Sequence, residues 1–166
     1  EVYTENGLFV PKNGLQKLAV LERHHASGRV GLGILRGFDI HNGAIATTVG
    51  HDSHNLVVVG DNDADMLMAV DVLEECGGGY VVVSKGEVKA KLVLSVAGLM
   101  SDAPLEIILK HQRELLEAAE NLGIHTESDP FITLSFIALP VIPDVRLTDM
   151  GLFNVRTMEF FNKINQ

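Results

Sequence analysis

The sequence predicts an α+β domain, with a mixed, largely antiparallel sheet and two main helices packed on it. Short runs of Val, Ile and Leu, bounded by glycine or polar residues, predict several strands. Two longer segments carry apolar residues three and four positions apart, which predicts helices. The order strand–strand–strand–helix–strand–strand–helix–strand, with hairpins between neighbouring strands, favours the α+β class. A length of 166 residues fits a single domain over 1–166.

The strands expected before the first helix are short and apolar. The first covers 15–23, where apolar and polar residues alternate roughly. The segments 30–34 and 37–40 are pieces punctuated by glycine. Two apolar strands follow over 44–50 and 56–60, and they enclose a short polar turn.

The first helix is expected to begin at Asn62 and to end near Gly77. Asp63 and Asp65 lie in its first turn, where carboxylates complement the positive end of the helix dipole. Its apolar face consists of Met66, Ala69, Val70 and Leu73.

A hairpin is expected next, with strands over 80–84 and 87–94 joined across Lys85 and Gly86. In its second strand, apolar residues alternate with Glu and Lys, so one face is expected to be buried and the other wet.

The second helix is expected over 104–122. Ser101 or Asp102 can cap it, Pro104 suits its first turn and Gly123 can end it. The residues expected on its core face are Leu105, Ile108, Leu109, Leu115, Leu116, Ala119 and Leu122. A last strand is expected over 132–139, followed by an extended crossing over 140–143 that contains two prolines.

Composition and charge narrow the classes of function. With 22 acidic and 13 basic residues the formal net charge is -9, which argues against nucleic acid as a partner. No apolar run is long enough for a membrane span, and the N-terminus does not have the pattern of a signal peptide. Cys76, the single cysteine, excludes an internal disulfide, so a cytoplasmic location is expected. The chain starts at Glu1 rather than Met, which suggests a piece of a longer chain.

The polar turn consists of five consecutive residues: His51, Asp52, Ser53, His54 and Asn55. Either histidine could move a proton near neutral pH, and Asp52 could orient an imidazole or bind a cation. Ser53 could act as a nucleophile only if a histidine reaches it. The alternative is an ordinary turn in which Asp52 and Asn55 bond to local backbone groups and the histidines are exposed. Turn chemistry does not account for two histidines, so the turn is a candidate catalytic site.

Arg23, His24 and His25 form a second polar cluster at the end of the first strand. Adjacent residues of a strand point to opposite faces, so at most one of the two histidines can join any one site. A solvated strand end is the simpler interpretation unless a partner is found.

Other candidate motifs favour structural interpretations. The glycine-rich segment 28–33 does not match the dinucleotide fingerprint, and tight turns or close backbone approach explain it better. The segment 98–102 could present a helix N-terminus to an anion, but N-capping is simpler. No histidines have His-x-His or His-Glu-x-x-His spacing, and Pro-Cys-x-x-Cys does not occur, so no metal site is predicted in the chain.

Several longer motifs follow one another along the chain: 22–28 (Glu-Arg-His-His-Ala-Ser-Gly), 31–33, 37–38, 43–49, 51–55, 59–60, 65–66, 77–79, 98–102, 129–131, 139–143 (Leu-Pro-Val-Ile-Pro) and 147–149. In these motifs the chain resembles the C-terminal domain of bacterial adenine deaminases of the amidohydrolase superfamily. The resemblance covers nearly the whole chain.

This resemblance implies hydrolysis of adenine to hypoxanthine and ammonia, a reaction of purine metabolism. In the family, a metal-bound hydroxide in a (β/α)8 barrel, with manganese or iron, attacks the purine carbon that bears the amino group. A metal generates such a nucleophile by lowering the pKa of bound water. This chain contains no barrel, so none of the family's metal ligands is assigned to it, and no cofactor is expected within it.

The resemblance also implies a domain that packs on its own N-terminal barrel and completes or covers the active site. The residues expected to face the barrel as catalytic groups are His51, Asp52, Ser53 and His54. Those expected near the substrate or the interface are Asn55, Arg23, His24 and His25. The implied partners are adenine and the barrel, a homo-oligomer is left open, and the isolated chain is expected to be inactive.

Two other functions are compatible with the residues. One is a non-catalytic binding or assembly module, in which the polar turn is structural or docks a partner subunit. The other is a small independent hydrolase that uses the two histidines and Asp52. It is the least favoured, because three good ligands and their supporting groups are hard to find locally. A barrel-length segment upstream of Glu1, with His-x-His near its start, would favour the deaminase.

Overall fold

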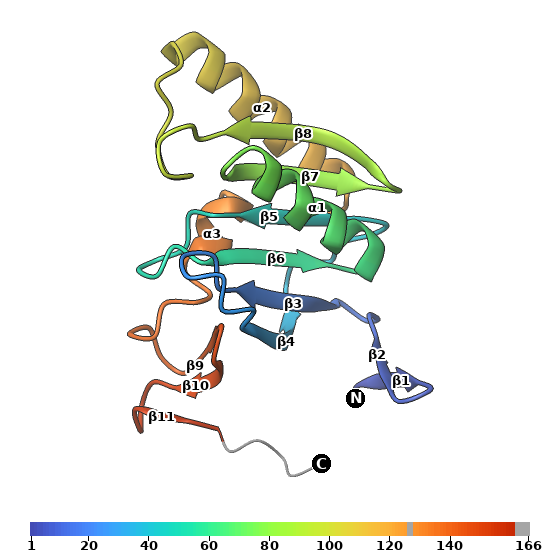
Figure 1. Ribbon diagram of the computed structural model, residues 1–166. Coiled ribbons are helices and arrows are strands. Elements are labelled where there is room, and N and C mark those ends of the chain that lie inside the picture. Colours follow the sequence, from blue (N-terminus) through green and yellow to red (C-terminus); the bar gives the residue numbers. More distant parts are fainter. Residues whose placement is uncertain (126–127, 162–166) are drawn as a thin grey trace.

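A six-stranded sheet forms the centre of the fold in the computed structural model, which describes residues 1–125 and 128–161 (Figure 1). Its strands are β3 (Leu15–Leu21), β4 (Val30–Arg36), β5 (Ala44–Thr47), β6 (Leu56–Gly60), β7 (Gly79–Ser84) and β8 (Glu87–Val93). Their order is β4-β3-β6-β5-β7-β8, and every neighbouring pair is antiparallel. The predicted α+β class with a largely antiparallel sheet is confirmed.

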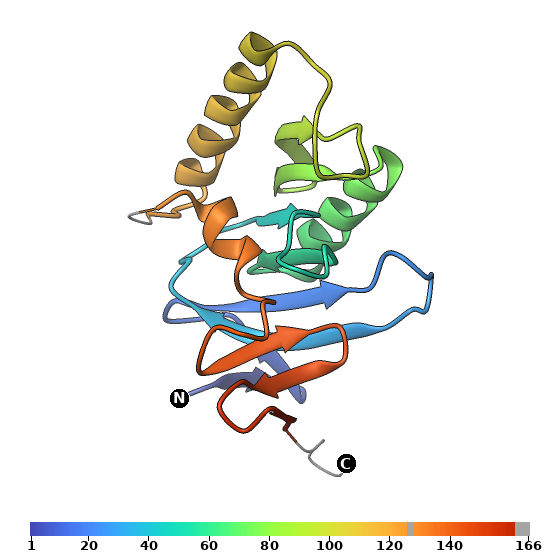
Figure 2. The same cartoon turned by 90° about the vertical axis from the view of Figure 1, so that its left-hand side faces the viewer.

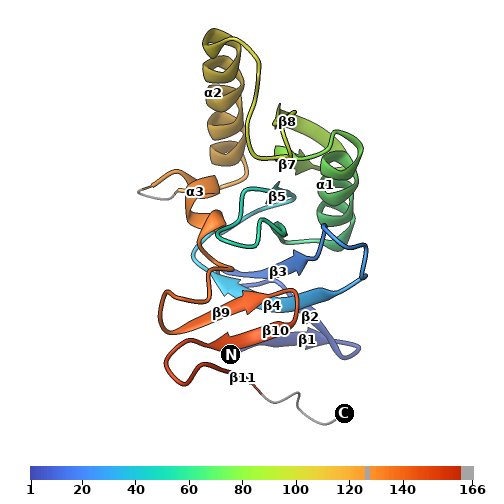
Figure 3. The same ribbon diagram turned by 60° about the vertical axis from the view of Figure 1, so that its left-hand side comes forward.

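The helix α1 (Asp63–Glu75) covers one face of this sheet, opposite to α2 and α3 (Figure 3). Its buried residues Met66, Ala69 and Leu73 join one apolar cluster with side chains of β3, β5, β6 and β7. The side chain of Asn62 caps the helix by accepting a hydrogen bond from the Asp65 amide at 2.8 Å. The predicted helix and its cap are confirmed, because periodicity, cap and first-turn charge all agree.

The other face is covered by α2 (Leu105–Asn121) and α3 (Pro130–Ser135). Only the second half of α2 packs closely, with Leu115 and Ala119 buried. The first half extends beyond the sheet (Figure 2), so Leu105 and Leu109 are exposed rather than part of the core. The core face predicted for this helix is therefore correct for its second half and for Ile108, which packs against the core, and wrong for Leu105 and Leu109.

The expected cap of α2 is also wrong. Pro104 occupies the N-cap position, and no side chain bonds to the first turn there. The Ser101 hydroxyl accepts a hydrogen bond from the Ala103 amide, and Asp102 accepts one from the Ser95 hydroxyl at 2.6 Å. Both polar groups therefore hold the preceding loop instead of the helix.

The strand predicted over 132–139 is a helix and a turn. Asp129 caps α3, since its side chain accepts hydrogen bonds from the amides of Phe131 and Ile132, and Pro130 occupies the first turn. Phe131 and Leu134 are both buried and lie three residues apart, as one face of a helix requires. The apolar run suggested a strand, but the Asp-Pro pair before it is a helix start.

Two small sheets complete the fold, and neither is predicted from the sequence. One pairs β1 (Tyr3–Glu5) with β2 (Leu8–Val10), and the other contains β9 (Val145–Thr148), β10 (Gly151–Asn154) and β11 (Glu159–Phe160). The three-stranded sheet packs against β4, where a Cβ on Gly31 would lie 1.8 Å from the Thr148 carbonyl oxygen. The close backbone approach predicted for the glycine-rich segment 28–33 is thereby confirmed at Gly31.

Within the described ranges, none of the helices is both long and apolar enough to cross a membrane.

Candidate functional site

The polar turn, residues 51–55, connects β5 and β6 at one end of the central sheet. Both strands are buried along their whole length, so the turn is anchored on a rigid base. Within the turn, the His54 amide donates to the Gly50 carbonyl at 2.6 Å. The His51 amide donates to the carbonyl of Ser135 in α3 at 2.9 Å. The turn is therefore held both by its own backbone and by the helix beside it.

The rings of the two histidines of the turn lie near each other but have different surroundings. Their ring centroids are 6.2 Å apart. His51 stacks on Phe136, with centroids 4.7 Å apart and an angle of 27° between the rings. The Nδ1 atom of His54 is shielded from solvent and has no hydrogen-bond partner among the described residues. The His51 ring is thus held by stacking, whereas the hydrogen bonds of His54 hold its backbone.

The pKa of His54 is lowered, first by burial and then by its electrostatic interactions with His51 and Arg23. Near neutral pH, His54 is therefore an uncharged imidazole, which can accept or donate a proton.

Arg23 and His24 reach the polar turn from the loop that joins β3 to β4. Arg23 Nε donates to the His54 carbonyl at 2.6 Å, and its Nη2 donates to the Ala97 carbonyl at 2.8 Å. His24 Nε2 is hydrogen-bonded to the Ser53 carbonyl at 2.7 Å. Burial lowers the pKa of Arg23, and an arginine guanidinium keeps its charge in proteins.

His25 is exposed, and its hydrogen bond runs from its backbone amide to Glu22 at 2.8 Å. Of the two adjacent histidines, the structure brings only His24 to the turn. The strand argument for this outcome does not apply, because β3 ends at Leu21 and both histidines lie in the loop after it. Both histidines are exposed, as the solvated interpretation expects, but His24 also has a hydrogen-bond partner in the turn.

Glu22 organises this loop with a single side chain. Its carboxylate accepts hydrogen bonds from the amides of His24, His25 and Ser27, and from the Ser27 hydroxyl at 2.7 Å. These bonds, with those from Ser27 the strongest, lower the pKa of Glu22 from 4.5 to about 2. Its role was not predicted, because a lone glutamate at a strand end gives no signal in the sequence.

Ser53 and Asp52 are exposed, and neither is part of a nucleophilic pair. The Ser53 hydroxyl accepts a weak hydrogen bond from the Asn55 amide at 3.4 Å. Among residues 1–125 and 128–161, no histidine nitrogen is hydrogen-bonded to that hydroxyl; His24 bonds to the Ser53 carbonyl instead. The arrangement therefore gives no support to Ser53 as a nucleophile.

Asn55 points inward and is only 4% exposed. Its side-chain amide donates to Asp149 Oδ1 at 3.1 Å, and Asp149 Oδ2 accepts a hydrogen bond from Arg29 Nε at 2.7 Å. Neither Asp149 nor Arg29 was a candidate from the sequence, and Phe136 was also missed. Asp149 lies 94 residues from Asn55 along the chain, so no local pattern could reveal the contact.

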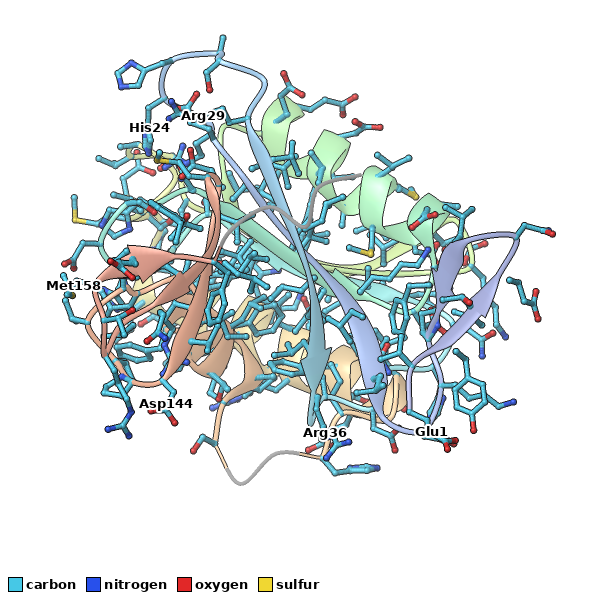
Figure 4. The ribbon with its side chains drawn as sticks, turned by 90° about the horizontal axis from the view of Figure 1, so that it is seen from below. Glu1, His24, Arg29, Arg36, Asp144 and Met158 are labelled. Atoms are coloured by element: carbon cyan, nitrogen blue, oxygen red, sulfur yellow. The ribbon has the colours of Figure 1, made fainter. Side chains whose placement is uncertain are left out.

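Together these segments form one cluster of polar groups at a single end of the sheet. Figure 4 shows His24 and Arg29 at the same end of β3 and β4, with Arg36 at the other end. In the part of the chain that the structure describes, no three His, Cys, Asp or Glu side chains come together as ligands for a metal. The cluster offers imidazoles that can exchange protons, a guanidinium and an exposed carboxylate.

Comparison with known proteins gives one consistent answer. The family model described as "Adenine deaminase C-terminal domain" matches residues 1–159. A protein of Nitratidesulfovibrio vulgaris strain Hildenborough named adenine deaminase is 56% identical over 156 residues, which cover 93% of this chain and 27% of that protein. Adenine deaminases of Leuconostoc mesenteroides and Halalkalibacterium halodurans are 48% and 46% identical, covering 96% and 98% of this chain and 28% of each relative. The chain thus spans little more than a quarter of the length of the curated relatives it matches.

Proposed function

This chain belongs to the family of adenine deaminase C-terminal domains, and on that premise we propose that it is the C-terminal part of a longer enzyme that hydrolyses adenine to hypoxanthine and ammonia. The observation that carries the proposal is the family match over 1–159, together with relatives named adenine deaminase. Under this proposal the enzyme acts in purine metabolism in the cytoplasm, and its substrate is a small purine.

We propose that the polar turn faces the active site of the remaining part of the enzyme. Exposed apolar side chains border the turn and its bonded partners, and such a border is typical of a surface that another part of a protein covers. Phe136 stacks on His51, Met150 follows Asp149, and Val96 and Met100 flank the loop that accepts a hydrogen bond from Arg23. These contacts support a docking face around the turn.

In this arrangement His51 and His54 are the groups that can exchange a proton with substrate or product. His51 remains partly exposed, and the lowered pKa of His54 keeps its imidazole neutral near neutral pH. Asp52 and His24 lie beside them, and Arg23 fixes the backbone of the turn. Under this proposal the manganese or iron that the family implies is held by the remaining, barrel part of the enzyme.

The test compares three preparations with adenine and added manganese: the full-length enzyme that carries this chain, the chain alone, and full-length variants. We expect turnover by the full-length enzyme, none by the chain alone, and a decrease of about a hundredfold for His51→Ala or His54→Ala. His111→Ala is the matched control, because His111 lies on α2 and bonds to Glu114, away from the turn.

The outcomes separate the competing functions. Full-length protein that does not hydrolyse adenine would contradict the proposal. Turnover that both histidine variants leave unchanged would favour a binding or assembly module attached to an active barrel. Adenine hydrolysis by the chain alone would support an independent hydrolase instead.

A further inference from the structure

We propose that Asp149 is a positioning residue for the polar turn: its carboxylate, held by Asn55 and Arg29, sets the orientation in which His51 and His54 are presented. Asp149 lies in the turn between β9 and β10, which comes from the three-stranded sheet and not from the central one. The effect on catalysis rests on the proposed function, whereas the positional role rests on the contacts of Asp149 alone.

The first support is that the carboxylate is largely withdrawn from water. The Asp149 side chain is 12% exposed, and each of its oxygens has a different partner. Oδ1 accepts from the Asn55 amide group, and Oδ2 accepts from the Arg29 guanidinium, which is a charge-assisted bond. A carboxylate shielded in this way is stable only with such partners, so the contact is specific.

The second support is the place of Asn55 in the turn. Asn55 is the last residue of the turn, directly before β6, and its side chain is buried. His54 precedes it and adopts a left-handed backbone with φ of 51°, a conformation that non-glycine residues adopt only when their surroundings hold them. A bond that fixes Asn55 therefore limits how the backbone carrying His54 can rotate.

The third support is that Asp149 joins two segments that both touch the turn. Arg29 closes the loop in which Arg23 and His24 bond to the carbonyls of His54 and Ser53. Asp149 thus bonds to the end of the polar turn and to the end of the loop that lies on it. Loss of the Asp149 carboxylate removes both of these bonds at once, whereas loss of the Arg29 side chain removes only the bond to the loop.

The experiment uses Asp149→Ala and Asp149→Asn in the full-length enzyme, with Asp144→Ala as the matched control. Asp144, labelled in Figure 4, also pairs with an arginine, Arg156. It precedes β9, whereas Asp149 follows that strand. We expect Asp149→Ala to lower kcat about a hundredfold with little change in KM, because a small misplacement of reacting groups has an effect of that size. Asp149→Asn, which keeps an acceptor for Asn55, should recover part of the loss, and Asp144→Ala should match wild type.

A second measurement is independent of activity. In the NMR spectrum of the 166-residue chain, Asp149→Asn should shift the amide signals of residues 51–55 and 23–24, and Asp144→Ala should leave them in place. Unchanged signals and wild-type kcat in both Asp149 variants would overturn the inference while the deaminase proposal stands. If wild-type full-length protein has no activity on adenine, the proposed function and the catalytic part of this inference both fail. An equal rise in KM for Asp149→Ala and Asp144→Ala would reduce Asp149 to a merely structural role.

Discussion

At the scale of single residues, Glu22 illustrates how one carboxylate can organise a loop. Its two oxygens accept four hydrogen bonds from three residues that follow it. Those bonds favour the ionised form and lower its pKa from 4.5 to about 2. Because the folded pKa lies below the unfolded value, ionised Glu22 stabilises the fold above pH 4.5, and this contribution disappears as the pH falls towards about 2.

We therefore expect Glu22→Gln to lower the urea midpoint at neutral pH, and the difference from wild type to shrink as the pH falls from 4.5 towards about 2. Urea unfolding of the chain across this range measures it. Glu5→Gln, at an exposed position of β1, is the control and should show little difference at any pH. A difference for Glu22→Gln that stays constant with pH would show that charge is not the cause.

The residues of the site could be predicted from the sequence only in part. His51, His54 and Arg23 stand out because two imidazoles and a guanidinium border apolar strands. Their partners do not stand out: Phe136 lies in a segment expected to be a strand, and Asp149 is far along the chain. Residue type reveals which groups can do chemistry, but long-range packing decides which of them meet.

At the scale of elements, α1 shows why some predictions succeed. Its apolar spacing, its Asn62 cap and its acidic first turn all indicate a helix at the same place, and its apolar face packs on the sheet as that spacing requires. In the short run 132–139 the signals do not agree on one structure, because an apolar segment of that length suits a strand or a buried helix equally. There the decision comes from Asp129 and Pro130, which lie before the run.

Two leucines of α1 provide a matched test of burial. Leu73 is 1% exposed within the cluster on the sheet, and Leu67 is 64% exposed on the outer side of the same helix. We expect Leu73→Ala to lower the free energy of unfolding by about 2–5 kcal/mol, and Leu67→Ala by no more than about 0.5 kcal/mol. Urea unfolding measures both, and equal losses would contradict the assigned orientation of α1.

At the scale of the whole molecule, the approach of β4 to the three-stranded sheet joins two parts of the fold. Gly31 leaves no room for a side chain, because its Cβ would lie 1.8 Å from a backbone oxygen of Thr148. Gly33, two residues on, would meet only the flexible end of Leu147 at 3.2 Å. The position of Thr148, and with it that of the neighbouring Asp149, therefore depends on a glycine in another sheet.

Gly31→Ala should separate the two sheets locally, since a backbone atom cannot move aside as a side chain can. We expect a loss of stability of about 1–3 kcal/mol and faster amide hydrogen exchange in β9 and β10, measured by mass spectrometry. Gly33→Ala, the matched control, should produce a smaller change in both. Exchange in β9 and β10 that is the same in wild type and Gly31→Ala would mean that other contacts hold the three-stranded sheet.

The position of Glu1 has a consequence for any polypeptide that precedes it. Glu1 lies towards the end of β4 that carries Arg36, opposite to His24 and Arg29 (Figure 4). A tether attached there lies towards the end of the sheet opposite to His24 and Arg29, and β4, which runs between these ends, spans about 23 Å at the usual rise of a strand. Such a tether raises the local concentration of the domain, but it does not fix the orientation of the domain. Alignment of the histidines with a neighbouring active site would then have to come from the non-covalent contacts around the turn.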